Sequence, residues 1–397
     1  MDSKERMLAA LRGRPVDKLP VAPIYLHLYL AQEIRLRALA GYQALIGDRQ
    51  EVSLEAAQEA RIQTRAIREA WSSLGETPDW IWTPLLAPAE WLAECVLLRQ
   101  DDQLWRIHCP SGEREELSAA VVETDSTADH WEQPLPRTHA EVDAMIPVPT
   151  AEKLLSSNSL VVARRLVEEM GGEIFVPGKM GSAFWRCYSL LGFQGLMTMP
   201  YDNPKLLHYM LQRQTAALLA LVRAYAKVGV HGVFIEECLT SADLISPRIY
   251  DEFVFPYDQA LLAEFRALSL PTIFYVCGDV VPRLPRLVKL APTALAVEES
   301  KKGFRIDLAE VAAAVGDRMA LFGNLDATGI KDWDDAELAY QIEGQVKAAR
   351  PSRGFIVSMG SPFPLETPRQ RVADFIGMAR AAARATARQV PLEDHSG

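Results

Sequence analysis

The second half of the chain alternates short apolar runs with longer amphipathic segments. From about residue 150 onward, runs such as Gly232-Val-Phe-Ile235 and Thr272-Ile-Phe-Tyr-Val276 are each followed by a segment whose apolar residues recur at helical spacing. Apolar strands that alternate with helices are typical of a parallel sheet that is buried on both faces. This pattern predicts an α/β fold.

Eight candidate strands are spread along the whole chain. They begin near residues 20, 79, 173, 232, 271, 293, 318 and 354. The helices that we predict cover residues 54–74, 150–170, 182–200, 203–228, 246–268, 281–290, 307–315, 334–349 and 367–385. Because eight strands are the number in a (β/α)8, or TIM, barrel, we expect that architecture. A doubly wound open sheet is the alternative, but no Gly-x-Gly-x-x-Gly follows a strand in this sequence.

Three segments do not follow the alternation. The chain opens with a helical segment, for which Ser3 is the expected cap and which ends before Gly13. In residues 92–118, short apolar runs are separated by polar turn residues, which predicts a small antiparallel β-hairpin. Residues 119–149 are polar and rich in proline, which predicts an irregular connection.

Length and composition are those of an ordinary folded protein. The chain has 397 residues, of which 49% are hydrophobic and 24% charged. We therefore expect a single barrel domain over residues 1–397, with the hairpin and loop as an insertion at about 92–149. The polar tail at 386–397 is expected to fray.

Charge and cysteine content narrow the class of protein. Lys and Arg number 42 and Asp and Glu 52, so the net charge is −10, whereas a nucleic-acid-binding protein usually needs a basic face. No apolar stretch reaches the roughly 20 residues that span a bilayer, and the N-terminus lacks the apolar core of a secretory signal. The five cysteines are odd in number and far apart, which favours reduced thiols. We therefore expect a cytoplasmic protein with a small-molecule substrate and with neither a nucleic-acid nor a membrane partner.

Polar and aromatic residues gather where the predicted strands end. In a (β/α)8 barrel the active site lies at the carboxyl ends of the strands, so these residues are the candidates for a site. The candidate site residues are His27, Asp79, Trp80, Lys179, Trp185, Glu236, Glu237, Tyr275, Cys277, Asp279, Glu299, Asn324, Asp326 and Ser361.

Several of these candidates have a purely structural alternative. Glu236 and Glu237 are adjacent, so a strand points them to opposite faces and only one of them enters the barrel mouth. Asn324 and Asp326 are also residue types that shape a turn through hydrogen bonds to their own backbone. The aromatic candidates suit a pocket, although packing in the core is their commoner role.

Two cysteines raise the question of a metal. Cys238 and Cys277 follow neighbouring predicted strands, and two thiols with one carboxylate would form a zinc set that lacks one ligand. Most buried cysteines are instead small core residues.

Four stretches of the sequence resemble the uroporphyrinogen decarboxylase superfamily. They are residues 4–20, residues 244–257, residues 316–326 with their Gly-Asn-Leu-Asp end, and residues 354–368 with their Glu-Thr-Pro end. This resemblance implies a (β/α)8 barrel, in agreement with the strand count.

The resemblance is to the corrinoid-linked methyltransferase branch rather than to the true decarboxylases. True decarboxylases carry an arginine-rich segment of the type Arg-Gln-Ala-Gly-Arg after the first strand, where it holds substrate carboxylates. Here residues 25–32 read Tyr-Leu-His-Leu-Tyr-Leu-Ala-Gln, and Arg35 is the first arginine that follows. Bidentate carboxylate binding needs guanidinium groups at such a position.

The zinc ligands of the thiol-activating members are not all present. In those members a His-x-Cys after strand five and a second cysteine after strand eight bind zinc, and here the three positions are Tyr275, Cys277 and Ser361. The resemblance therefore implies no zinc site of that pattern. No Asp-x-His-x-x-Gly motif for cobalamin is present either, so cobalamin would be carried by a partner protein.

The resemblance implies a methyltransferase or demethylase component. It would move a methyl group between a small methylated substrate and a corrinoid protein, with Glu237 or Asp279 as general acid or base, Tyr275 as hydrogen-bond donor and Cys277 as the retained thiol. The other candidates would bind the substrate, since carboxylates and aromatic faces together can hold a cation. Two alternatives stay open, namely a decarboxylase or other lyase acting on a carboxylated substrate and a non-catalytic ligand-binding barrel.

Overall fold

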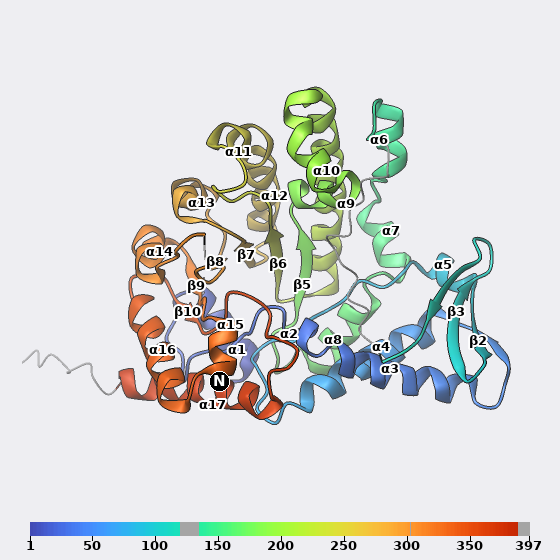
Figure 1. The fold of residues 1–397 in the computed structure, drawn as a ribbon, viewed down its shortest axis with the longest axis horizontal. Coiled ribbons are helices and arrows are strands. Elements are labelled where there is room, and N and C mark those ends of the chain that lie inside the picture. Colours follow the sequence, from blue (N-terminus) through green and yellow to red (C-terminus); the bar gives the residue numbers. More distant parts are fainter. Residues whose placement is uncertain (120–134, 302, 388–397) are drawn as a thin grey trace, which may run out of the picture.

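A parallel sheet forms the centre of the molecule (Figure 1). The computed structural model describes residues 1–119, 135–301 and 303–387. The sheet has six strands in the order β10-β9-β8-β7-β6-β5, and every neighbouring pair is parallel. The predicted α/β fold with a parallel sheet is thus confirmed. Its strands are β5 (Pro177–Gly181), β6 (Gly232–Glu237), β7 (Thr272–Val276), β8 (Ala294–Val297), β9 (Ala320–Phe322) and β10 (Phe355–Ile356).

The first two predicted strands are reduced to single bridges. Val21 pairs in parallel with Val357, and Trp80 pairs in parallel with Phe175. The run that begins near residue 20 cannot continue as a strand, because Pro20 and Pro23 carry no N–H for a ladder. The chain instead enters the short helix α2 (Leu26–Tyr29). The prediction that a strand runs to the histidine at position 27 is therefore wrong.

Helices cover the outer side of the sheet, and Figure 1 shows them following the strands in chain order. Two predicted helices are each divided in the structure. The segment 150–170 is interrupted near Asn158, which adopts a left-handed backbone with φ 68°, and the segment 246–268 is interrupted at Val254, just before Pro256. The helices of this layer are α7 (Ala151–Ser156), α8 (Val161–Met170), α9 (Ala183–Asp202), α10 (Pro204–Val228), α11 (Pro247–Phe253), α12 (Phe255–Ala267), α13 (Leu284–Leu290), α14 (Leu308–Val315), α15 (Ala327–Asp332), α16 (Asp335–Ala348) and α17 (Arg369–Ala387).

The N-terminal helix begins one residue earlier than the sequence indicated. In α1 (Ser3–Leu11) the cap is Asp2, whose Oδ1 accepts a hydrogen bond from the backbone N of Glu5 at 2.7 Å. The Glu5 carboxylate accepts in return from the backbone N of Asp2. This capping box satisfies two free donors of the first turn, which explains why Ser3 is not the cap.

A second, antiparallel sheet of four strands stands at the edge of the molecule beside α3 (Ala31–Ile46) and α4 (Ala56–Ser72) (Figure 1). The predicted hairpin is present in it as β2 and β3, joined through Asp101 and Asp102, both with positive φ as a tight two-residue turn requires. An additional strand flanks the hairpin on each side. The strands are β1 (Glu51–Ser53), β2 (Cys95–Gln100), β3 (Gln103–His108) and β4 (Glu113–Glu116).

The segment predicted as an irregular connection contains a helix. Within residues 119–149, α6 (His139–Met145) begins at Thr138, whose side chain accepts from the backbone of Glu141 in a capping box. The helix α5 (Ala89–Ala93) precedes the hairpin. Residues 120–134 of the predicted insertion, and the predicted tail from 388 onward, lie outside the described residues. Within the ranges that are described, no helix is both long and apolar enough to cross a membrane.

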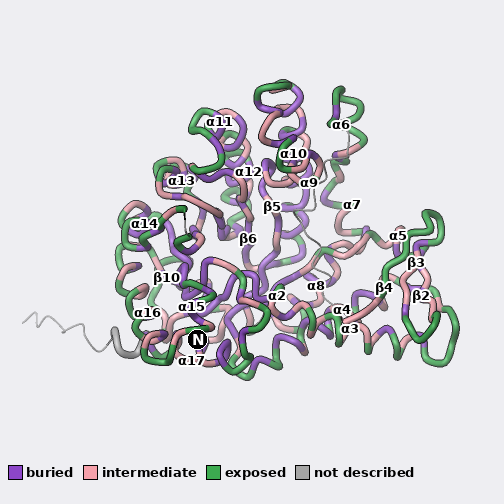
Figure 2. The backbone as a smooth tube through the Cα atoms, viewed as in Figure 1, coloured by how far each residue is buried: buried purple, intermediate pink, exposed green. Residues whose placement is uncertain are grey.

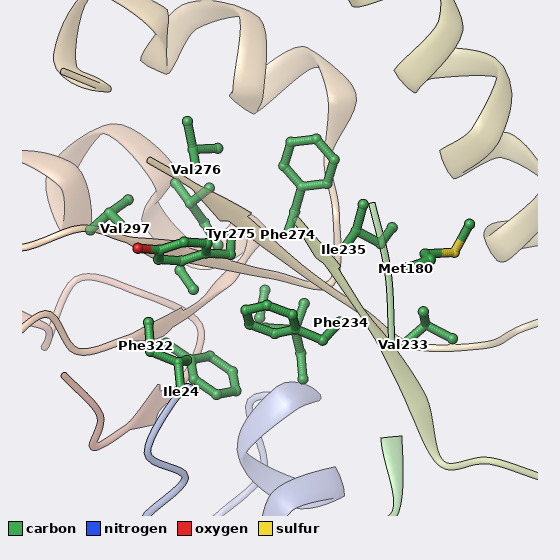
Figure 3. Packing of buried hydrophobic residues seen from close by; sticks show 14 of the residues in the cluster. Ile24, Met180, Val233, Phe234, Ile235, Phe274, Tyr275, Val276, Val297 and Phe322 are labelled. Atoms are coloured by element: carbon green, nitrogen blue, oxygen red, sulfur yellow. The ribbon is translucent and has the colours of Figure 1, made fainter. Parts of the chain in front are cut away.

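Side chains on the inner side of the central sheet form an aromatic layer. Figure 3 shows the rings of Phe234, Tyr275 and Phe322 on one side of the strands, whereas Phe274 points to the other side, toward the helices. The ring of Trp80 lies 5.6 Å from that of Phe322. All five rings are buried, in keeping with the buried centre in Figure 2. This layer, called the aromatic floor below, lies beneath the polar residues at the strand ends.

Candidate active site

A lysine and a glutamate meet above this aromatic floor. Lys179 belongs to β5 and Glu236 to β6, and the Lys179 Nζ lies 3.1 Å from Glu236 Oε1. The same Nζ stands 5.5 Å from the ring centroid of Tyr25 and 5.4 Å from that of Trp82. One carboxylate and two aromatic faces therefore hold the ammonium group, which is the environment in which a cation is stabilised by ring quadrupoles.

His27 contributes an uncharged imidazole to this group. Its ring centroid lies 4.5 Å from that of Trp82. Burial, together with the positive charge of Lys179, lowers the pKa of His27 to about 3, so the ring is neutral at physiological pH. Among the described residues, neither His27 Nδ1 nor Trp82 Nε1 has a hydrogen-bond partner, although both atoms are buried. Because buried polar atoms are normally paired, these two are available to a ligand.

Tyr25 links the lysine to the rest of the site. Its ring stacks on Trp82 at 6.3 Å and meets Tyr275 edge-on at 5.4 Å. Burial raises the pKa of Tyr25 well above its ordinary value, and the nearby Glu236, Tyr275 and cysteine side chains raise it further. Its φ of 56° is left-handed, which costs a non-glycine residue about 1–2 kcal/mol. Such strain is concentrated at functional sites.

A second charged group stands at the ends of β8 and β10. Lys301 Nζ lies 3.0 Å from Glu298 Oε1 and 3.1 Å from Glu299 Oε1, and it also contacts the Ser361 hydroxyl. Burial lowers the pKa of Lys301, but the two carboxylates outweigh burial and raise it. Ser361 Oγ donates to Glu299 Oε1 at 2.6 Å, and Glu298 Oε2 accepts from the backbone N of Gly278 at 2.7 Å.

Two of the three residues at the zinc-ligand positions, Tyr275 and Ser361, do not fit a zinc ion. The Tyr275 hydroxyl donates to the carbonyl oxygen of Gly360 at 2.6 Å, and the Ser361 hydroxyl is bound to Glu299. Neither oxygen is a thiolate or imidazole of the kind that structural and catalytic zinc prefers. In the part of the chain that is described, no group of three or more His, Cys, Asp and Glu side chains could hold a metal ion.

Glu237 lies on the other side of β6 from Lys179. Its fully buried carboxyl faces Ser182 before α9, Thr240 in the loop after β6 and Asp258 of α12, and burial raises its pKa to about 7. Burial and the neighbouring Glu237 also raise the pKa of Asp258 well above its ordinary value. Side chains alternate along a strand, and Glu236 shares the inner side with Phe234. The predicted role of Glu237 at the mouth therefore conflicts with its position.

Asp79 and Trp80 are structural residues at the opposite end of the sheet. Asp79 Oδ1 lies 2.5 Å from Nη1 of Arg6, and its Oδ2 accepts from the backbone N of Val21 at 2.8 Å. Trp80 is fully buried, and its Nε1 donates to the carbonyl oxygen of Pro23. The structure thus corrects their placement among the substrate-binding candidates, since both precede the strand end at which the site lies.

Asp279 and Asp326 shape turns. Asp279 Oδ1 accepts from the backbone N of Val281 at 3.3 Å at the start of a 3-10 turn. Asp326 caps α15 by accepting from the backbone N of Thr328 at 2.9 Å. The structure brings neither carboxylate to Lys179. Both side chains instead accept hydrogen bonds from backbone N–H groups two residues further on, as turn-forming aspartates do.

Asn324 and Trp185 are also engaged with the scaffold. Asn324 Nδ2 donates to the carbonyl oxygen of Glu298, and its Oδ1 accepts from Gln345 Nε2 at 2.9 Å. Trp185 lies in the first turn of α9, where its ring stacks on Tyr188 at 5.0 Å. Asn324 therefore positions the segment that follows β8 at Glu298 instead of contacting Lys179.

The comparisons with known proteins agree on one family. The family described as uroporphyrinogen decarboxylase (URO-D) matches residues 117–382. The chain is 27% identical over 225 residues to uroporphyrinogen decarboxylase 2, chloroplastic, of Arabidopsis thaliana, a match that covers 55% of each chain. The chain therefore spans about half the length of that relative.

Similarity to methyltransferases extends over more of the chain. The methylcobamide:CoM methyltransferase MtaA of Methanosarcina barkeri is 23% identical over 357 residues, which cover 88% of this chain and 92% of that protein. The solved structure of a methyltransferase from Methanosarcina mazei has the same fold, with a TM-score of 0.64, 18% identity and coverage of 98% of this chain and 99% of that one. The match of the family to more than half of the chain shows that this protein belongs to the uroporphyrinogen decarboxylase family, whose named relatives include both decarboxylases and methyltransferases.

Proposed function

We propose that this chain is the methyltransferase or demethylase component of a system that moves a methyl group between a small methylated substrate and a corrinoid protein. The observation that carries the proposal is the Lys179–Glu236 pair, seated on the rings of Tyr25 and Trp82 at the strand ends. The similarity to the methyltransferase MtaA over 88% of the chain supports the reaction class.

We also propose that the central sheet closes into a single (β/α)8 barrel domain. Two parallel bridges support this, because Val21 pairs with Val357 at one end of the six-stranded sheet and Trp80 pairs with Phe175 near the other. The backbone N of Asp79 donates to the carbonyl oxygen of Val21 at 2.8 Å, which joins the two bridging segments. A closed barrel would bring the ends of the first and last strands to the same mouth.

The lysine is suited to proton transfer. When a methyl group leaves a heteroatom, the bond between them breaks, and the heteroatom keeps the electron pair and needs a proton. We assign this proton to the Lys179 ammonium, oriented by Glu236, in place of the role that the sequence suggested for Glu237 or Asp279. The corrinoid, carried by the partner, supplies the methyl-accepting chemistry. His27 Nδ1 and Trp82 Nε1 would orient the substrate by accepting and donating a hydrogen bond.

The charge of the site favours a neutral substrate. Lys179 already fills the space over the two rings, so a quaternary ammonium compound would compete with it for the same faces. A methylated oxygen, sulfur or uncharged nitrogen would instead accept a hydrogen bond from the ammonium. Tyr275, whose ring lies 5.4 Å from that of Tyr25, and Cys277, two residues further along the chain, would border the same site.

A decarboxylase is the second candidate, and the matches to named decarboxylases favour it. Decarboxylation of a substrate with several carboxylates needs cationic groups to hold them. Arg37, on the helix that follows the first bridging segment, is bound to Glu33 and Glu69 instead. In a decarboxylase, Lys179 and Lys301 would therefore have to hold the substrate carboxylates.

The two functions can be separated in one anaerobic experiment. Reduced free cobalamin serves as the probe for the partner's cofactor, and methanol, methylamines, methyl thioethers and methoxylated aromatics are supplied as donors. We expect at least one donor to methylate the cobalamin, which its absorption spectrum reports, and we expect uroporphyrinogen to remain unchanged. Conversion of uroporphyrinogen, without methylation by any donor, would overturn the proposal. Binding of a donor without turnover would favour the non-catalytic barrel.

A further inference from the structure

Two cysteines occupy matching positions at the ends of neighbouring strands. Cys238 follows β6 and Cys277 follows β7, and the last residues of those strands, Glu237 and Val276, are paired in register. The backbone N of Cys277 donates to the carbonyl oxygen of Glu237 at 3.2 Å, which continues the pairing to the cysteines. Their Sγ atoms are 2.8 Å apart.

Both thiols face the site. By alternation along the strands, Cys238 lies on the side of Glu236 and Cys277 on the side of Tyr275, the ring that points inward in Figure 3. Both cysteines are half-buried, so neither residue is fully enclosed in the core. Beyond each thiol the chain turns away through a residue with positive φ, Leu239 after the first and Gly278 after the second.

We propose that Cys238 and Cys277 form a reversible dithiol–disulfide site at the mouth of the barrel. Neighbouring strands lie about 4.8 Å apart. Native disulfides join Cα atoms that are about 4.4–6.8 Å apart. The pair can therefore be bridged without moving the backbone. The inference stands apart from the proposed methyl transfer, because it concerns the oxidation state of the two thiols and not the reaction at Lys179.

The oxidant that we name is a low-molecular-weight disulfide such as oxidised glutathione. One cysteine, as a thiolate, attacks a sulfur of glutathione disulfide, which forms a mixed disulfide and releases one glutathione thiol. The second cysteine then attacks the protein sulfur of this mixed disulfide and releases the other glutathione. The two protein thiols are oxidised, one glutathione disulfide is reduced to two thiols, and the two protons pass to the leaving glutathiones.

The disulfide would change the site directly. It would tie the ends of β6 and β7 together and remove two thiols that both raise the pKa of Tyr25, including the free thiol of Cys277. In a reducing compartment such bonds are transient and regulatory. The site would therefore be open in the reduced protein and altered in the oxidised protein.

The test counts thiols by mass spectrometry in the full chain. Cys109→Ser is the reference protein, because Cys109 is exposed and would otherwise form mixed disulfides of its own, whereas Cys95 and Cys187 are buried. After incubation with oxidised glutathione, we expect a loss of the mass of two hydrogens and a tryptic link between peptides 228–248 and 267–283. Dithiothreitol should restore the original mass.

Two further variants in the same background identify the pair. Cys238→Ser and Cys277→Ser should each lose the link and instead carry a single glutathione on the remaining cysteine. Glutathione attached to both Cys238 and Cys277 in the reference protein, with no link between the peptides, would overturn the proposal. So would two cysteines that stay unmodified under conditions in which Cys109 of the wild-type chain reacts. Neither readout depends on methyl transfer, so failure here is distinct from failure of the proposed function.

Discussion

The ammonium of Lys179 lies 3.1 Å from the Glu236 carboxylate. The lysine side chain is 29% exposed and that of the glutamate 14%, so water screens this pair less than it screens a surface pair. The rings of Tyr25 and Trp82 flank the ammonium on the remaining sides. The Lys179 ammonium, which is the proposed proton donor, is therefore oriented before any substrate binds.

Removal of the Trp82 ring should weaken substrate binding. The ring supports Lys179 and carries the unpartnered Nε1, so Trp82→Leu should raise KM roughly fivefold, in line with about 1 kcal/mol for a cation–ring contact. Steady-state kinetics of methyl transfer measure this change. Trp91→Leu is the matched control, because Trp91 stands beneath Arg106 in the other sheet, away from the site. An equal rise of KM in both variants would contradict the assignment.

Glu237 should make the protein less stable as the pH rises. Its pKa is about 7 in the folded chain against an ordinary value of 4.5, so the folded state binds more protons than the unfolded state between those pH values. Stability is therefore highest below about pH 4.5 for this group and falls as the pH rises to 7. Glu237→Gln, which resembles the protonated form, should be roughly 1–3 kcal/mol more stable than the wild type at pH 8, and its advantage should fall below about 1 kcal/mol at pH 5.

Urea unfolding at the two pH values measures this difference. Glu264→Gln is the control, because that carboxylate forms a surface pair with Arg223 and should give no gain at pH 8. If Glu237→Gln is no more stable than the wild type at pH 8, then ionisation of the buried Glu237 carboxyl does not destabilise the folded protein.

Asp79 should matter for stability and not for catalysis. Its carboxylate is buried against Arg6, so Asp79→Asn leaves a buried guanidinium poorly compensated and should cost roughly 3 kcal/mol. Asp17 binds the same arginine from an exposed position, and Asp17→Asn should cost less than about 1 kcal/mol. Thermal unfolding separates the two variants. A selective loss of turnover in Asp79→Asn with unchanged stability would return Asp79 to the site.

Protein purified without chelators should contain far less than stoichiometric zinc. Tyr275 and Ser361 stand at two of the family's ligand positions, and both hydroxyls are occupied by hydrogen bonds. Elemental analysis of the wild type and of Cys277→Ser is the measurement, and we expect the same low value in both. Stoichiometric zinc that the Cys277→Ser variant loses would mean that an altered ligand set binds the metal.

The fold follows from the sequence wherever a strand is an unbroken apolar run. β6, β7 and β8 are such runs and lie where the pattern predicted them. The pattern predicts a strand that begins near residue 173, whereas β5 spans Pro177–Gly181, because its Pro-Gly-Lys-Met-Gly sequence carries no strand signal and is held by its pairing with β6. Tertiary pairing, and not local propensity, decides such a segment.

The site could be predicted only in part, because the sequence does not give the register. The sequence alone cannot tell which of Glu236 and Glu237 faces inward. Once Phe234 is seen to face inward, alternation along the strand places Glu236 on the same inner side, beside Lys179. The sequence does not identify Tyr25 as a site residue, because no neighbouring residue type signals that its backbone is left-handed. Trp82 is a pocket candidate from the sequence, because it lies two residues after Trp80 in a predicted aromatic strand, and that spacing places both rings on one side of an extended segment.

The most direct test of the account is the rate of methyl transfer to reduced free cobalamin by the Lys179→Met variant. Lys227→Met serves as the control, because Lys227 forms an exposed pair with Glu152 on the helical layer. Removal of a positioned proton donor costs about 10²–10⁴-fold in rate. We expect that loss in Lys179→Met with unchanged thermal stability, and a wild-type rate in Lys227→Met. A wild-type rate in Lys179→Met would contradict the claim that the Lys179–Glu236 pair is the reacting centre.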